Sequence, residues 1–177
     1  MTTRRTLLGS ALAAGAGALS ARATADASPS RFRPLEGAAH EQIAKVLDDW
    51  HAAAAAADES RYFGHMTADA VFLGTDATER WTKAEFQAYA HPHFAKGRAW
   101  SFTSVRRTVA FAADGRVAWF EEDLATPNLG PARGSGVLVL EDRMWRIAQY
   151  NLSVPIPNGI FDDVKKLIAA HLAKPKA

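Results

Sequence analysis

Three carboxylates in this 177-residue chain have the residue type and the surroundings that acid–base chemistry needs. Glu122 lies within an alternating apolar segment, and Asp76 and Glu79 follow a short apolar run. Burial in an apolar pocket raises the pKa of a carboxyl group, which can then abstract a proton next to a carbonyl near neutral pH. Glu122 and Asp76 are therefore the candidate catalytic bases. The structural alternative for Glu122 is an ion pair with Arg133 on a neighbouring strand, because buried acids are normally paired.

A second group of residues has the character of a ligand-binding rim. Glu79, Arg80 and Trp81 stand just before a predicted helix, where Arg80 could bind a ligand carboxylate or carbonyl. The alternative is an ion pair that braces the loop. Trp81 and Trp100 flank this helix and Tyr89 lies within it, so these rings are candidate walls for an aromatic or polycyclic ligand.

The last predicted strand, residues 144–154, offers neutral hydrogen-bonding groups and ends where Pro155 and Pro157 stop ladder pairing. Strict alternation places Gln149 and Asn151 on one face of this strand, together with Trp145, Ile147 and Ser153. We expect Gln149 and Asn151 to orient a ligand, with Arg133 from the neighbouring strand.

Metal and cofactor chemistry has little support in the sequence. The chain has no cysteine, and His91 and His93 have no third ligand at a suitable spacing, so no metal site is predicted. The segment Gly134–Gly136 interrupts a strand and does not open a helix, which argues against a phosphate loop. No cofactor is expected, and His51 is expected to be exposed on its helix.

The elements that must position these residues predict an α+β fold. Apolar periodicity and turn signals place three helices before a four-stranded antiparallel meander. The predicted helices cover residues 43–57, 60–66 and the segment after Thr82, and the predicted strands cover residues 71–74, 100–112, 117–125, 132–141 and 144–154. Helices packed on one face of a strongly curved sheet would leave a cone-shaped cavity.

The first 25 residues predict a secretory signal peptide. Arg4 and Arg5 precede an Ala-, Leu- and Gly-rich run that ends in an A-x-A site, which is typical of the twin-arginine export route. Its removal takes away three arginines and no acid, which leaves 18 basic and 19 acidic residues. We therefore expect a periplasmic or secreted protein with no nucleic-acid partner and no stable membrane insertion. Residues 26–37 are expected to form a linker.

Three segments resemble the SnoaL-like branch of the nuclear transport factor 2-like superfamily. They are Phe72–Asp76 with Glu79–Trp81, Arg133–Leu138, and Trp145–Asn158. The resemblance places this domain at residues 38–158, followed by an amphipathic helix within residues 159–177. It implies a cone-shaped α+β fold, a pocket at the open end and a homodimer through the outer face of the sheet.

The superfamily contains both enzymes and binding domains, so the fold leaves the function open. The main expectation is a domain that binds a small, mostly apolar molecule in its cone. One alternative is a cofactor-free isomerase, cyclase or dehydratase that uses a pocket carboxylate. Another is a non-catalytic dimerisation or interaction module whose cone is filled by side chains. The volume of the pocket and the partners of Glu122 distinguish these functions.

Overall fold

The computed structural model describes residues 32–33 and 37–174. The predicted signal peptide and most of the predicted linker lie outside these residues. Residues 32–33 of that linker form a short strand, β1 (Phe32–Arg33), which pairs with β4 instead of forming a loop. The helices are α1 (Ala38–Ala55), α2 (Glu59–Gly64), α3 (Lys83–Ala95) and α4 (Phe161–Leu172), with a 3₁₀ turn at Asn158–Ile160.

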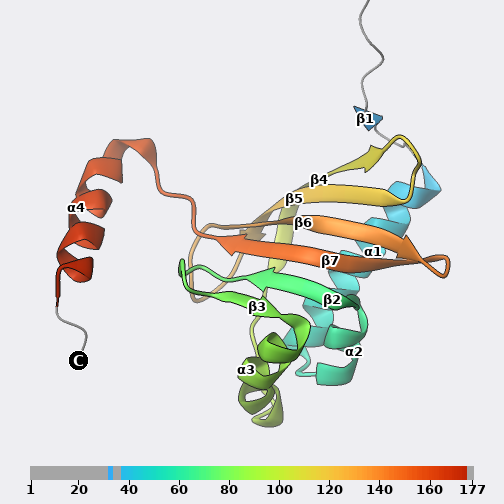
Figure 1. Cartoon of the computed structure of the whole chain (residues 1–177), viewed down its shortest axis with the longest axis horizontal. Helices are drawn as coiled ribbons and strands as arrows, with labels where there is room; N and C mark the ends of the chain where they lie inside the picture. The colour runs from blue at the N-terminus through green and yellow to red at the C-terminus, as the bar shows by residue number, and fades with distance from the viewer. Residues whose placement is uncertain (1–31, 34–36, 175–177) are drawn as a thin grey trace, which may run out of the picture. The chain divides into compact units, whose positions relative to one another are not determined.

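One seven-stranded sheet organises the described residues, in the order β1-β4-β5-β6-β7-β2-β3. Its other strands are β2 (Met66–Leu73), β3 (Arg80–Thr82), β4 (Thr103–Ala112), β5 (Val117–Ala125), β6 (Ala132–Glu141) and β7 (Met144–Ser153). The predicted antiparallel meander is confirmed as β4 to β7, and β2 then adds to β7 in parallel. Figure 1 shows the strands following one another across the sheet, with α1 crossing one face.

Local signals explain the helices. The alanine-rich second half of α1 has high helix propensity, and α1 buries Ile43, Leu47 and Trp50. Asp58 caps α2 by accepting the Arg61 N–H. Thr82 and Glu85 form the predicted capping box at the start of α3, which continues to Ala95.

The core lies between the helices and the concave face of the sheet. α1 packs on β4 and β7, and α3 packs on β2 and β3. Buried side chains alternate along β5 as Ala118, Phe120, Glu122 and Leu124, so one face of this strand points into the core. A carboxylate in such a series must find its partners inside the fold.

A bulge in β7 overturns the predicted faces of this strand. Leu138 of β6 pairs with Ile147 while Val137 pairs with Gln149, so Ala148 has no partner on β6 within the described sheet. The extra residue reverses the alternation, and Tyr150 points into the core in place of Gln149. Gln149 and Asn151 consequently face the opposite side of the sheet, away from the helices.

The C-terminal helix α4 lies within residues 159–177 and buries none of its residues, all of which are described. Its apolar side chains Leu167, Ile168 and Leu172 are exposed. Within the described part of the chain, no helix has both the length and the apolar character needed to cross a membrane.

Candidate functional site

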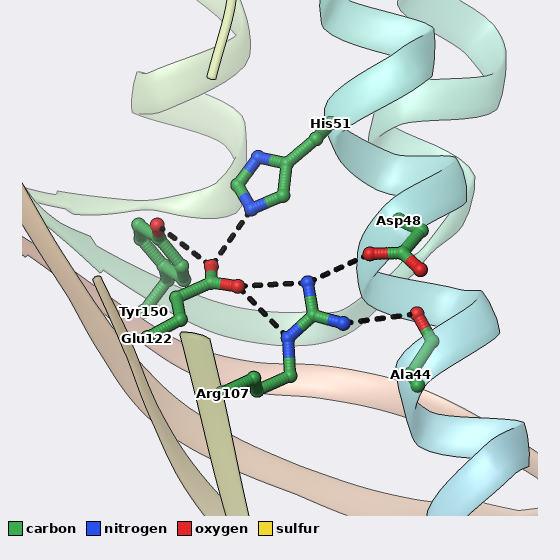
Figure 2. Close-up of polar contacts among 6 residues, drawn as sticks. All are labelled: Ala44, Asp48, His51, Arg107, Glu122 and Tyr150. Carbon is green, nitrogen blue, oxygen red and sulfur yellow. Dashed lines mark hydrogen bonds and ion pairs between the residues drawn. The ribbon is translucent and has the colours of Figure 1, made fainter. Parts of the chain in front are cut away.

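A buried cluster of charged side chains lies between α1 and the sheet. Glu122 projects from β5, Arg107 from β4, and His51 and Asp48 from α1 (Figure 2). The Glu122 side chain is fully buried, and His51 and Arg107 are nearly so. Because burying an isolated charge is very costly, such a cluster is stable only if its members pair with one another.

Each carboxylate oxygen of Glu122 has its own basic partner. His51 Nε2 lies 2.7 Å from Glu122 Oε1, and the Tyr150 hydroxyl donates to the same oxygen at 3.4 Å. Arg107 Nε donates to Glu122 Oε2 at 2.9 Å, and Arg107 Nη2 lies 2.8 Å from it. Both oxygens are therefore occupied, and neither is available as a base.

Arg107 also ties the sheet to α1. Its Nη2 lies 2.9 Å from Asp48 Oδ1, and its Nη1 donates to the Ala44 carbonyl oxygen at 3.3 Å (Figure 2). The guanidinium thus joins one residue of β5 to two residues of α1. This geometry uses the planar, multidentate character of arginine, which a lysine lacks.

The pKa values of this cluster follow from burial and pairing. Burial acts to raise the pKa of Glu122, but the hydrogen bonds and charges of His51 and Arg107 outweigh it, so this pKa lies below the usual glutamate value. Burial raises the pKa of Tyr150 well above its ordinary value, and the Glu122 carboxylate adds to this effect. At neutral pH the site therefore holds a carboxylate and a neutral phenol.

The predicted ion pair between Glu122 and Arg133 is absent from the described residues, because strand register forbids it. Arg133 of β6 pairs with Asp123, and Glu122 pairs with Gly134. The Arg133 and Glu122 side chains therefore project from opposite faces of the sheet, and the exposed Arg133 lies 4.0 Å from Asp123. The expectation that His51 is exposed is likewise wrong, because only 5% of it is accessible.

Gly134 makes room for the cluster. A Cβ atom at this position would overlap the Tyr150 hydroxyl and lie 3.0 Å from Glu122 Oε1. Gly136 is confined in the same way, since a Cβ at this position would overlap the Gln149 carbonyl oxygen. The small residues in β6 allow Tyr150 and Glu122 to meet.

A separate pocket of about 260 Å³ opens beside this cluster. Aromatic rings from α3, from β2 and β3, and from the segment before β4 dominate its walls. The lining residues are Phe72, Gly74, Thr75, Glu79, Trp81, Phe86, Tyr89, His93, Trp100, Phe102, Thr126, Asn128, Leu129 and Leu152. We call this cavity the aromatic pocket. Its volume is just below the range usual for ligand sites.

The pocket rings form a connected stack. Trp81 stacks on Tyr89 with ring centroids 4.8 Å apart and on Phe86 at 5.7 Å. Phe86 in turn stacks on Phe72 at 3.9 Å and on Trp100 at 5.8 Å. Rings that support one another in this way are held in place before a ligand arrives.

The aromatic pocket and the buried cluster are neighbours, with aromatic side chains between them. Phe102 lines the pocket, and its ring centroid lies 6.0 Å from that of His51. Phe72, which also lines the pocket, stacks on Tyr150 with ring centroids 5.5 Å apart. Neither His51 nor Glu122 lines the pocket among the described residues. A layer of aromatic side chains thus separates the cluster from a molecule in the pocket.

The structure brings four predicted ligand residues together and leaves four elsewhere. Glu79, Trp81, Tyr89 and Trp100 line the aromatic pocket. The other four, which do not line it, are Arg80, Arg133, Gln149 and Asn151. Arg80 alternates with Trp81 on β3, so its side chain points away from the pocket.

Asp76, the second candidate base, stabilises a turn. Its Oδ1 accepts the Thr78 hydroxyl at 2.6 Å and the Thr78 N–H at 2.8 Å, and these bonds lower the pKa of the exposed Asp76 carboxyl group. Such contacts are those of an Asx turn. Asp76 is also not among the residues that line the pocket.

Sequence reasoning missed His51 and Arg107, although a signal for each was present. His51 follows Ile43 and Leu47 at intervals of four residues, which places it on the buried face of α1. Arg107 lies on the same face of β4 as Val109 and Phe111, which are buried. His91 binds Glu59, and within residues 37–174 no group of side chains could hold a metal ion.

Comparisons with known proteins agree with this architecture. The sequence matches the profile of the SnoaL-like domain over residues 43–157. The chain belongs to the SnoaL-like family. The comparison with curated proteins gives no match for this family member.

Solved structures share the fold of this SnoaL-like chain at low identity. A nuclear transport factor 2-like protein of unknown function from Pseudomonas putida has a TM-score of 0.55 and 15% identity, over 68% of this chain and 89% of that one. A proposed aromatic ring hydroxylase from Novosphingobium aromaticivorans has a TM-score of 0.58 and 16% identity, over 71% and 93%. A proposed scytalone dehydratase from the same organism has a TM-score of 0.56 and 9% identity, over 66% and 84%. Such identities show the fold alone.

The adjacent arginines of β4 provide a matched test of the buried cluster. Arg107→Met leaves the buried Glu122 carboxylate short of a partner, so we expect the free energy of unfolding to fall by about 3–5 kcal/mol. Arg106→Met removes an exposed ion pair with Asp123, so we expect little change. Urea unfolding followed by circular dichroism measures both. Equal losses in the two variants would contradict a buried, energetically important cluster.

The lowered pKa of Glu122 predicts how stability depends on pH. Its stabilising contribution is complete above the ordinary glutamate pKa of about 4.3 and is lost as the pH falls through the lower pKa of the folded state. The stability difference between the wild type and Glu122→Gln should therefore shrink as the pH falls from 7 to 3.5. Urea midpoints at several pH values measure this difference. A difference that stays constant would show that the Glu122 pKa is not shifted by folding.

Proposed function

We propose that this SnoaL-like domain binds a small, mostly apolar molecule with an aromatic ring in the aromatic pocket. The observation that carries the proposal is the wall composition, because Phe72, Trp81, Phe86, Tyr89, Trp100 and Phe102 all line one cavity. Apolar walls with few polar groups are typical of small-molecule sites.

The volume and the polar groups of the pocket support a ligand of modest size. A cavity of about 260 Å³ is not filled by side chains, which favours a ligand over a purely structural cone. Thr75, Thr126 and Asn128 offer neutral hydrogen bonds that would orient the ligand.

Binding is better supported than catalysis by either of the two predicted bases, Glu122 and Asp76. A base must reach the proton that it removes, and it must have a free oxygen. Glu122 is paired with His51 and Arg107 behind the aromatic layer, and Asp76 is engaged with Thr78. The geometry therefore supplies neither of the two predicted bases to a molecule in the pocket.

Export is a separate part of the proposal, and it rests on the twin arginines and the apolar run that follows them. Replacing both Arg4 and Arg5 by lysine should leave the precursor in the cytoplasm, because the twin-arginine export machinery recognises the arginine pair. Arg22→Lys, which makes the same change near the cleavage site, should export normally. Immunoblots of periplasmic and cytoplasmic fractions measure both variants. Export of the double variant at the wild-type level would refute the twin-arginine route.

Ligand binding can be tested with a rim residue that the fold does not need. Tyr89 is half exposed and lines the pocket, so Tyr89→Ala should weaken binding of indole and 2-naphthol about tenfold while preserving the fold. Isothermal titration calorimetry measures the affinity, and thermal shift gives an independent check.

The control for this experiment is Gln149→Ala, since Gln149 faces the other side of the sheet. It should bind both probes with wild-type affinity. The proposal fails if neither probe binds the wild type, or if both variants lose affinity equally.

A further inference from the structure

The Glu79 carboxylate lies in the wall of the aromatic pocket without a cationic partner. Among the described residues that line this pocket, Glu79 is the only acid, and there is no lysine or arginine. No ion pair joins Glu79 to a basic side chain in the described part of the chain. The half-buried Glu79 carboxylate is therefore a negative charge in the pocket wall that no lysine or arginine offsets, and His93 is the only other lining residue with a basic side chain among those described.

Local hydrogen bonds hold this carboxylate in place. The Asp76 N–H donates to Glu79 Oε2 at 3.1 Å, and the Gly74 N–H donates to the Glu79 carbonyl oxygen at 2.9 Å. The Glu79 side chain occupies the space beside Gly74, where the Cβ of any other residue would overlap Oε2. Glu79 is thus fixed against the pocket wall, and its Oε1 accepts no hydrogen bond from the described residues.

Like the Glu79 carboxylate, the aromatic rings of the pocket favour a positively charged ligand. Trp81 lies two residues further along the chain and stacks on Tyr89 and Phe86. The faces of aromatic rings carry negative charge density and attract cations, and tryptophan does so most strongly. A carboxylate beside several rings is the arrangement that recognises ammonium groups.

We propose that the ligand of the aromatic pocket is an organic cation with an ammonium group on an apolar, aromatic body. The ammonium group binds near Glu79, and the body packs on the rings of α3 and β3. This inference rests on the proposed function, because it requires that the pocket binds a small molecule. The inference specifies that the molecule carries a positive charge, and it names Glu79 as the residue that recognises this charge.

Two probes of the same shape and different charge test the inference. Benzyltrimethylammonium carries a quaternary nitrogen, and neopentylbenzene carries a carbon atom at that position. Both are titrated against the full chain by isothermal titration calorimetry, and indole serves as a neutral reference. We expect the wild type to bind the cation roughly tenfold more tightly than its neutral isostere.

Two variants that each remove one negative charge show whether the preference for the cationic probe depends on Glu79. Glu79→Gln keeps the hydrogen-bond acceptor but removes the charge, so most of the preference for the cation should disappear. Glu121→Gln makes the same change at an exposed position of β5 and should retain the preference. Retention of the preference in Glu79→Gln would overturn the role of Glu79.

The remaining outcomes separate this inference from the proposed function. If the wild type binds both probes and indole with equal affinity, the ligand is not a cation, although the pocket still binds small molecules. If none of the three probes binds, both the cation and the pocket as a ligand site are refuted.

Discussion

The buried carboxylate of Glu122 is the constraint on which the described fold depends. Its charge lies inside the core, so the surrounding elements must present His51 and Arg107 to it. Those two residues come from α1 and β4, which fixes the helix on the sheet in one position. A shift of α1 by one turn would leave a charge buried without a partner, whereas apolar contacts alone would tolerate it better.

Much of the fold could be predicted from the sequence because its local signals are strong. The capping box at Thr82, the alternation along β4 to β6 and the turns between them are all determined by neighbouring residues. The bulge at Ala148 could not be predicted, because it depends on how β7 meets both β6 and β2. Because of this one extra residue, Gln149 and Asn151 lie on the face of the sheet opposite to the predicted one.

Some residues of the aromatic pocket, but not the partners of Glu122, could be grouped from the sequence, for a related reason. Trp81, Trp100, Tyr89 and Glu79 belong to α3 or to its flanks, so proximity in the sequence correctly grouped them. His51 comes from α1, which is distant from Glu122 in the sequence, and only strand register decides between Arg107 on β4 and Arg133 on β6. Phe72, Phe86 and Phe102 also line the pocket, and nothing in an aromatic residue type distinguishes a pocket wall from a core.

The parallel pairing of β2 with β7 also determines when the fold can be completed. Phe72 finds its strand partner in Tyr150, whereas the meander joins neighbours along the chain. Contacts between residues far apart in sequence carry the largest loop-closure cost and form late. The strand β2 can therefore join the sheet only after β7 has been synthesised and is free to pair with it.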